Sequence, residues 1–139
     1  MLEVFKHLGM QKINSILIFI GLLALDQATK LVFTNREYGI INYQVNYGAA
    51  FSILQGYRWL FIIIAVIVMI ALAVYYKYAE KKLPVILIMA GTAGNAIDRI
   101  FLGYVRDFID LKVWPVFNIA DSINLIGAVW LAYYLIKKK

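Results

Sequence analysis

Four aspartates stand out in this chain because each lies inside or beside an apolar segment. A carboxylate near a lipid bilayer is costly, so an ionisable residue in such a segment marks a functional site by default. Two carboxylates that share one proton can act as an acid–base pair, in which one activates water while the other protonates a carbonyl oxygen and then a leaving amine. The four residues are Asp26, Asp98, Asp107 and Asp121.

The sequence leaves open which two of these aspartates would form such a pair. Asp98 is followed by Arg99 at the expected end of a helix, which suits a structural ion pair. Asp107 is expected in a loop, where catalytic residues are frequent. Asp121 falls near the start of a helix, where the helix dipole stabilises an anion. Any two among Asp98, Asp107 and Asp121 are therefore candidates.

Other catalytic groups are scarce. The chain has no cysteine, which excludes a disulfide, a thiolate nucleophile and a cysteine-based zinc site. The single histidine, His7, follows Lys6 in the polar N-terminal segment and is expected to be a solvated surface residue. Carboxylates are therefore the groups with which this chain could activate water.

The composition predicts a membrane protein. The chain is 63% hydrophobic and 16% charged, with a mean hydropathy of +0.77, whereas soluble domains are about 45–50% apolar and about 25% charged. We expect a single integral-membrane domain over residues 1–139. Apolar runs predict four spanning helices, and the third is short enough to continue past Asp98. These helices are expected over residues 13–33, 59–76, 83–98 and 117–136.

The basic residues predict how these spans are oriented. Segments 1–12, 77–82 and 137–139 contain eight Lys or Arg and only two acids, whereas segments 34–58 and 99–116 mix five Lys or Arg with acids. By the positive-inside rule both termini and the 77–82 loop are cytoplasmic, and binding of nucleic acid is not expected. All four aspartates then lie at the extracytoplasmic end of the bundle, as one acidic site.

Local spacing suggests how the polar residues are arranged. Asp26 and Lys30 are four residues apart and are expected to form a structural ion pair. Asn118 is expected both to cap the last helix and to orient the carboxylates. Residues 39–48 are β-branched and aromatic, which predicts a short strand or hairpin on the membrane surface.

Five motifs, in this order along nearly the whole chain, closely resemble those of the lipoprotein signal peptidases (signal peptidase II), the integral-membrane aspartic peptidases of bacteria. The motifs span residues 26–30, 46–51, 91–99, 105–108 and 117–122. The resemblance implies an all-α membrane fold of four transmembrane helices with a small extracytoplasmic β-cradle. It also implies a place in the bacterial cytoplasmic (inner) membrane, with the active site at the extracytoplasmic face.

The resemblance further implies cleavage of diacylglyceryl-modified prolipoproteins just before the lipid-bearing cysteine, in contact with membrane lipid. It implies independence of metals and other cofactors, and inhibition by the cyclic peptide globomycin. The family's catalytic aspartates match Asp107 and Asp121. Its supporting polar residues match Asp26, Lys30, Asn46, Gly48, Asn95, Asp98, Arg99 and Asn118.

Two departures from the family pattern lie near the expected catalytic residues. The 14-residue stretch from Asp107 to Asp121 is shorter than expected. Arg106 precedes Asp107, where the family often has an apolar residue. An inward Arg106 side chain would lower the pKa of Asp107, but we expect it to point out to lipid headgroups. Asp110 is expected to be a solvated loop acid.

The rival hypothesis is a non-enzymatic conduit for protons or cations that uses the same acids, and a hard metal ion in the acid cluster is a lesser variant. A conduit needs polar residues through the whole membrane. The second span has no charged residue, and the cytoplasmic halves of the third and fourth are almost wholly apolar. This distribution favours chemistry at one membrane face.

Overall fold

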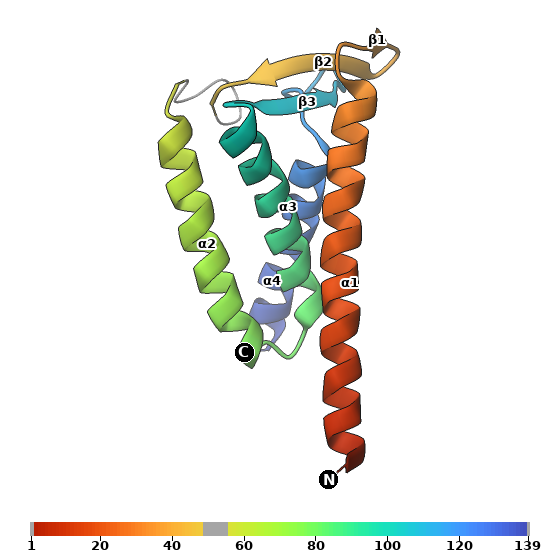
Figure 1. Ribbon diagram of the computed structural model, residues 1–139, viewed down its shortest axis with the longest axis vertical. Helices are drawn as coiled ribbons and strands as arrows, with labels where there is room; N and C mark the ends of the chain where they lie inside the picture. The colour runs from red at the N-terminus through yellow and green to blue at the C-terminus, as the bar shows by residue number, and fades with distance from the viewer. Residues whose placement is uncertain (1, 49–55, 139) are drawn as a thin grey trace.

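The structure, a computed structural model, describes residues 2–48 and 56–138. It contains four long helices and three short strands (Figure 1). Each of the four helices is long and apolar enough to cross a membrane, which confirms the prediction of four spans. The helices are α1 Leu2–Phe33, α2 Arg58–Tyr78, α3 Lys82–Phe101 and α4 Ile119–Lys137.

The helix ends differ from the predicted ones for local reasons. Helix α3 continues past Asp98 to Phe101, as its shortness allowed. Helix α4 begins at Ile119 rather than at residue 117 because Asn118 is its N-cap. The Asn118 side chain accepts a hydrogen bond from the Asp121 N–H, and the Asp121 side chain accepts one from the Asn118 N–H, forming a capping box.

The strands form one antiparallel sheet in the order β1-β2-β3, and this sheet lies across one end of the helical bundle (Figure 1). Strand β2 is the short strand predicted within residues 39–48, and it pairs with β1, which precedes that segment, across a turn that contains Gly39 at φ +60°. The strands are β1 Glu37–Tyr38, β2 Ile41–Asn46 and β3 Val105–Ile109.

Strand β3 corrects the prediction that Asp107 lies in a loop. Asp107 sits in the middle of β3, opposite Gln44 of β2. The first four residues of β3 are all buried, so they show no alternation of apolar and polar residues that would have indicated a strand. Its partner strand also lies about 60 residues earlier in the chain, beyond the reach of local pattern.

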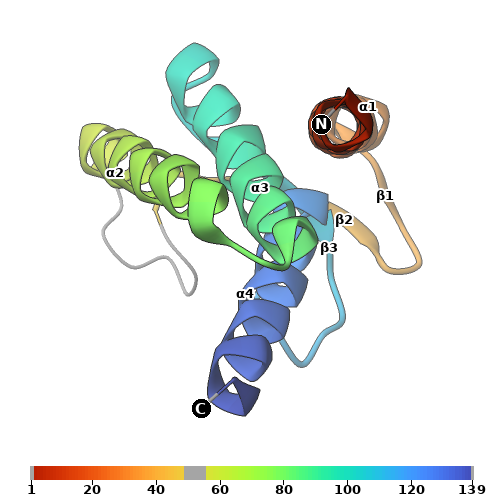
Figure 2. The same ribbon diagram turned by 90° about the horizontal axis from the view of Figure 1, so that it is seen from below.

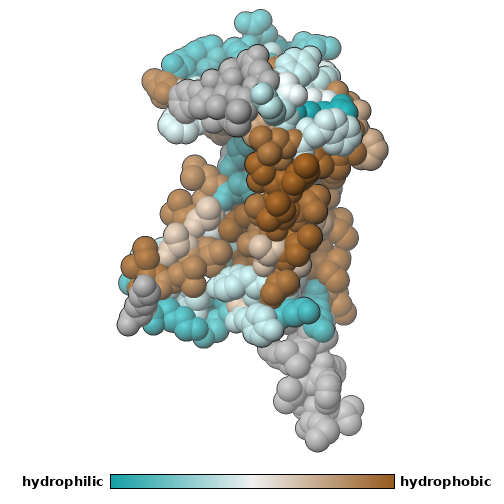
Figure 3. Space-filling model, turned by 90° about the vertical axis from the view of Figure 1, so that its left-hand side faces the viewer, coloured by the Kyte–Doolittle hydropathy of each residue, from teal (hydrophilic) through white to brown (hydrophobic). Residues whose placement is uncertain are grey.

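Helix α3 is the centre of the bundle, with α1, α2 and α4 placed around it (Figure 2). The side chains that face outward are apolar: Ile63, Ile67 and Ile70 of α2 are each more than half exposed. Figure 3 shows this apolar surface as a band between two more hydrophilic ends. Such a band fits the hydrocarbon of a bilayer and not water.

Helices α3 and α4 approach each other closely where glycine replaces a side chain. A Cβ on Gly127 would lie 2.8 Å from Ile88 Cγ1 and 2.9 Å from the carbonyl oxygen of Pro84. A Cβ on Gly94 would lie 2.5 Å from Asp26 Oδ2. Glycines therefore set the spacing of α3 against α4 at Gly127 and against α1 at Gly94.

We predict that Gly127→Ala destabilises the bundle by about 1–3 kcal/mol, because the added methyl group overpacks the α3–α4 contact. Gly21→Ala is the matched control, since a Cβ at Gly21 meets nothing within 4 Å. Thermal unfolding in detergent measures both variants. Equal unfolding midpoints for Gly127→Ala and the wild type would contradict the close contact.

Candidate active site

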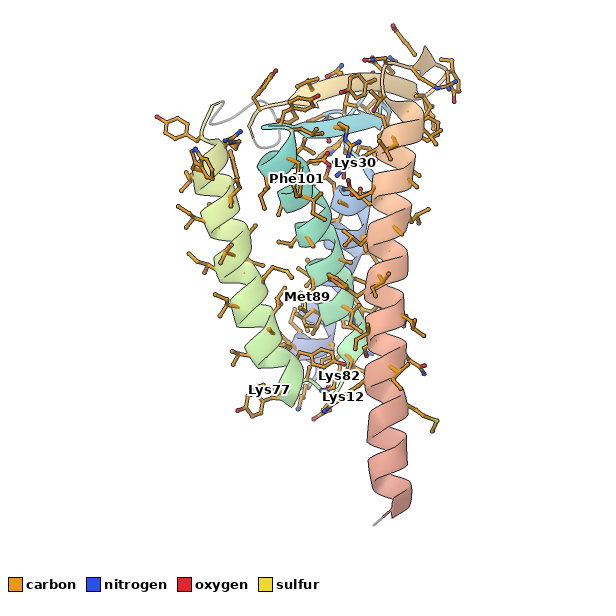
Figure 4. The ribbon with its side chains drawn as sticks, in the orientation of Figure 1. Lys12, Lys30, Lys77, Lys82, Met89 and Phe101 are labelled. Carbon is orange, nitrogen blue, oxygen red and sulfur yellow. The ribbon has the colours of Figure 1, made fainter. Side chains whose placement is uncertain are left out.

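A buried cluster of paired charges connects α1, α3 and β3 beneath the sheet, where Figure 4 labels Lys30. Lys30 Nζ lies 2.9 Å from Asp26 Oδ2 and 3.4 Å from Asp98 Oδ2, and all three side chains are 0% exposed. The expected Asp26–Lys30 ion pair is thus present and extends to α3. Arg106 donates to Asp98 through Nη2 at 2.7 Å and Nε at 3.2 Å.

Two predictions about the arginines were wrong. Arg106 points inward, and its partner is Asp98 rather than lipid headgroups or Asp107. Arg99 does not pair with its neighbour Asp98 but donates from Nη2 to the carbonyl oxygen of Gly48 at 2.9 Å. Its guanidinium also lies 4.7 Å from the centre of the Phe61 ring. Arg99 therefore links α3 to the segment after β2 and to α2.

Gln27 completes the charge cluster, and sequence reasoning gave it no role. Its Nε2 donates to Asp26 Oδ2 at 3.0 Å and to Asp98 Oδ1 at 3.3 Å. Its Oε1 accepts from Arg106 Nη2 at 2.8 Å. Throughout the described residues, every buried side-chain nitrogen or oxygen has a hydrogen-bond partner. This completeness matters, because a buried charge is tolerated only when it is paired and hydrogen-bonded.

Asp26 and Asn118 together satisfy the first N–H groups of α4. Asp26 Oδ1 accepts from the Ala120 N–H at 2.9 Å, and Asn118 Oδ1 accepts from the Asp121 N–H at 2.9 Å. The start of a helix carries partial positive charge, which favours an anion there. Helix α4, and with it Asp121, is thus anchored to a side chain of α1.

Asn118 is the residue that brings Asp107 and Asp121 together. Its Nδ2 donates to Asp107 Oδ1 at 2.7 Å, and its backbone N–H donates to Asp121 Oδ2 at 3.1 Å. Asn46 of β2 donates to the other Asp107 oxygen at 2.9 Å. Asn95 of α3 donates to the other Asp121 oxygen at 2.7 Å. Each of the four carboxylate oxygens therefore accepts one fixed hydrogen bond.

The charge cluster and this aspartate pair are connected. Asn95 Oδ1 accepts from Lys30 Nζ at 3.0 Å and from Asn118 Nδ2 at 3.1 Å. Asn95 therefore has its amide orientation fixed by Lys30, so that its Nδ2 must face Asp121. Asn95 and Asp98 are three residues apart on α3, so they share one helix face, and that face meets this network.

The environment of Asp107 keeps its carboxyl group protonated to unusually high pH. Burial raises the pKa of Asp107 to about 7, and the negative charge of Asp121 acts in the same direction. The hydrogen bonds from Asn46 and Asn118 favour the ionised form and oppose the shift. Asn118 thus bonds to both carboxyls, and the ionisation of Asp107 depends on the charge of Asp121.

A cavity of about 1120 Å³ opens beside the aspartate pair and includes both residues in its wall. The rest of its lining is mostly apolar and comes from several elements, with Phe61 on α2 and Leu125 and Ile126 on α4. The cavity is large enough for a drug-sized or peptide ligand. Among the side chains that the structure describes, in residues 10, 12–48 and 56–138, no group of three acids, histidines or cysteines could hold a metal ion.

Asp110 was expected to be solvated, but the structure buries it at 8% exposure. Its carboxylate accepts from Asn42 Nδ2 at 2.8 Å and from Lys112 Nζ at 2.8 Å. The Lys112 ammonium, followed by Asn42, lowers the pKa of Asp110 to about 2. Asp110 therefore ties the segment after β3 to β2 and is separate from the aspartate pair.

The structure also positions the remaining predicted residues. Gly48 is buried, and its N–H donates to Asn46 Oδ1 at 2.9 Å, which leaves Asn46 Nδ2 to face Asp107. The last residues of the 46–51 motif, Ala49, Ala50 and Phe51, lie outside the described residues.

Comparison with known proteins gives a family match over residues 18–137, to signal peptidase (SPase) II. A lipoprotein signal peptidase of Clostridioides difficile is 37% identical, covering 87% of this chain and 93% of the relative. One of Streptococcus pyogenes is 38% identical, covering 94% and 97%.

A solved structure described as a bacterial membrane enzyme, determined by the in meso method at 2.3 Å, superposes with a TM-score of 0.80. It is 34% identical, and the superposition covers 89% of this chain and 88% of that one. The family match spans most of the chain, and the relatives align over nearly their full lengths. The chain therefore belongs to the signal peptidase II family of lipoprotein signal peptidases, which are aspartic peptidases.

Proposed function

We propose that this protein removes the signal peptide from diacylglyceryl-modified bacterial prolipoproteins by cutting on the N-terminal side of the lipid-modified cysteine. Asp107 and Asp121 are the proposed catalytic residues. The observation that carries this assignment is that Asn118 donates a hydrogen bond to each carboxyl. Its Nδ2 lies 2.7 Å from Asp107 Oδ1, and its backbone nitrogen lies 3.1 Å from Asp121 Oδ2. The site would face the extracytoplasmic side of the bacterial inner membrane, since the opposite end of the bundle is rich in lysine.

The chemistry requires one proton on the pair. The ionised carboxylate takes a proton from water as the water oxygen attacks the scissile carbonyl carbon. The protonated carboxyl gives its proton to the carbonyl oxygen, so a tetrahedral diol forms. The pair then protonates the amide nitrogen and recovers a proton from the diol as the C–N bond breaks. Products leave, and the pair is back to one proton.

The three asparagines position the pair for this reaction. Asn46, Asn95 and Asn118 each donate to a carboxylate oxygen, at 2.9, 2.7 and 2.7 Å. A carboxylate oxygen has two lone pairs, so each keeps one for water or substrate. Because these hydrogen bonds already fix the orientation of the carboxyl groups, less entropy is lost when the transition state forms.

The cavity supports a substrate that approaches through the membrane. Its wall between α2 and α4 contains Phe61, Leu125 and Ile126, and the last two are 65% and 58% exposed on the lipid-facing surface. The apolar signal helix would lie along this wall, while the acyl chains stay in the bilayer and hold the lipid-bearing cysteine at the depth of the aspartates. A cyclic peptide inhibitor of the globomycin type would compete for the same cavity.

The described residues contain no continuous row of buried polar groups across the membrane, which the conduit hypothesis requires. The buried polar groups gather at the sheet end of the bundle. In α2 none of the residues is buried, and its lipid-facing surface is apolar. Polar groups at one end suit hydrolysis at an interface better than transport across the membrane.

We predict that Asp107→Asn and Asp121→Asn each lower the cleavage rate by about 10²–10⁴-fold or more, because each removes half of the acid–base pair. The measurement is gel-shift conversion of a diacylglyceryl-modified prolipoprotein by the purified protein with chelator present. Asp110→Asn is the control, since Asp110 lies three residues after Asp107 but its carboxylate is bonded to Lys112 and Asn42.

The control should keep wild-type activity within a few-fold. Wild-type cleavage by a correctly folded Asp107→Asn or Asp121→Asn variant would mean that the proposed pair is wrong. Loss of wild-type activity on adding chelator would point instead to a metal-dependent reaction.

We also predict that a prolipoprotein without its diacylglyceryl group is cleaved far less efficiently than the lipidated form. The acyl chains position the scissile bond against the aspartates, so their loss should lower kcat as well as raise KM. Purified protein in lipid nanodiscs, with both precursors at matched concentrations, gives the two parameters. Equal kcat/KM for the two precursors would refute positioning by the lipid.

A further inference from the structure

A second cavity, of about 280 Å³, lies far from the aspartate pair, near Met89 and the lysine-rich end of the bundle (Figure 4). It is bounded by α1, α2 and α3, and the two hydroxyl groups in its lining bond to each other: the Tyr76 hydroxyl donates to Ser15 Oγ at 2.8 Å. The other lining side chains are apolar. The cavity is far smaller than the one beside the aspartates, so it suits a single flexible chain rather than a signal helix.

Helix α1 forms one wall of this cavity, and Lys12 lies on the same helix face as the residues that line it. On α1, the lining residues Ser15, Ile16 and Phe19 follow Lys12 at spacings of three, four and seven. Residues at these spacings lie on one face of a helix. Lys12 therefore continues the α1 wall towards the end of the bundle, beyond the apolar lining.

The other two walls repeat this arrangement. On α2, Lys77 follows the lining residue Ala73 by four positions. On α3, Lys82 precedes the lining residues Ile86 and Met89 by four and seven positions. Figure 4 shows Lys12, Lys77 and Lys82 at the same end of the bundle, away from the sheet. Three helices thus each place one cation beyond one apolar cavity.

These three charges are not neutralised by acids of the protein. None of the three lysines forms an ion pair with an acid whose side chain the structure describes. Lys82 donates to the carbonyl oxygen of Tyr76 and lies 4.6 Å from the centre of its ring, which holds the ammonium beside the cavity. Glu80, in the same loop, is already engaged by Lys138 and Tyr134.

We propose that this cavity and its three lysines bind one anionic phospholipid from the leaflet on the side opposite the sheet. An acyl chain fills the space between α1 and α2 over α3, and the phosphate lies among Lys12, Lys77 and Lys82. Basic pockets between transmembrane helices bind anionic headgroups in this way. The occupant is a membrane lipid because the apolar part of the cavity faces the bilayer. This proposal does not depend on the peptidase reaction.

The test is native mass spectrometry of the full chain, reconstituted with equal amounts of phosphatidylglycerol and phosphatidylethanolamine and then released from its nanodiscs. We expect the wild type to retain one phosphatidylglycerol preferentially. The double variant Lys12→Gln/Lys77→Gln should lose this preference by about fivefold per lysine, since each cation near a headgroup contributes a factor of this size. Both side chains are exposed, so the variant should fold.

Two matched controls distinguish binding at this cavity from a general effect of positive charge and from a general effect of a larger side chain. Lys81→Gln/Lys137→Gln removes the same charge from the same end of the bundle without touching the cavity lining, and it should retain phosphatidylglycerol. Ala73→Trp should displace the lipid by filling the cavity, whereas Val74→Trp, one position further on the lipid-facing surface, should not. Equal retention of both lipids by the wild type, equal losses in the two double variants, or unchanged retention in Ala73→Trp would each overturn the proposal.

Discussion

The ammonium of Lys30 is the interaction on which the rest of the site depends. It lies 2.9 Å from Asp26, 3.4 Å from Asp98 and 3.0 Å from the amide oxygen of Asn95, and its side chain is 0% exposed. Removing a partner from a buried ion pair is strongly destabilising, because the other charge is left without compensation. Lys30 thereby holds α1 against α3 and also fixes the amide that faces Asp121.

The charges of the site balance when the aspartate pair holds one proton. Asp26 and Asp98 offset Lys30 and Arg106, to which they are bonded. Arg99 is the remaining cation, and it lies in the electrostatic field of both Asp107 and Asp121. A pair with a single proton carries one negative charge, which Arg99 offsets. The protonation state needed for catalysis is therefore also the one that makes the buried cluster neutral, which is the least costly state in a medium of low dielectric constant.

The sequence predicted those features that depend on neighbours along the chain. The four spans, the β2 strand, the Asp26–Lys30 pair and the Asn118 cap all follow from local periodicity or spacing. The features that were missed depend on distant partners. Strand β3 forms because it pairs with β2. The Arg106 side chain points inward because Asp98 and Gln27 accept its hydrogen bonds. Asp110 is buried where the side chain of Asn42, far away in the sequence, donates to its carboxylate. No local pattern around residues 105–110 contains this information.

The central claim is that Asp107 and Asp121 share one proton at neutral pH, and infrared difference spectroscopy of the purified protein between pH 4 and pH 9 tests it most directly. Because burial raises the pKa of Asp107 to about 7, the account predicts a protonated carboxyl band that persists to about that pH. This band should be absent at pH 6 from Asp107→Asn. It should disappear at a lower pH in Asp121→Asn than in the wild type, because that variant lacks the charge of Asp121 but keeps Asp107 buried, and it should remain in Asp110→Asn. A wild-type protein whose carboxyl groups are all ionised at pH 6, or a band that survives unchanged in Asp107→Asn, would contradict the account.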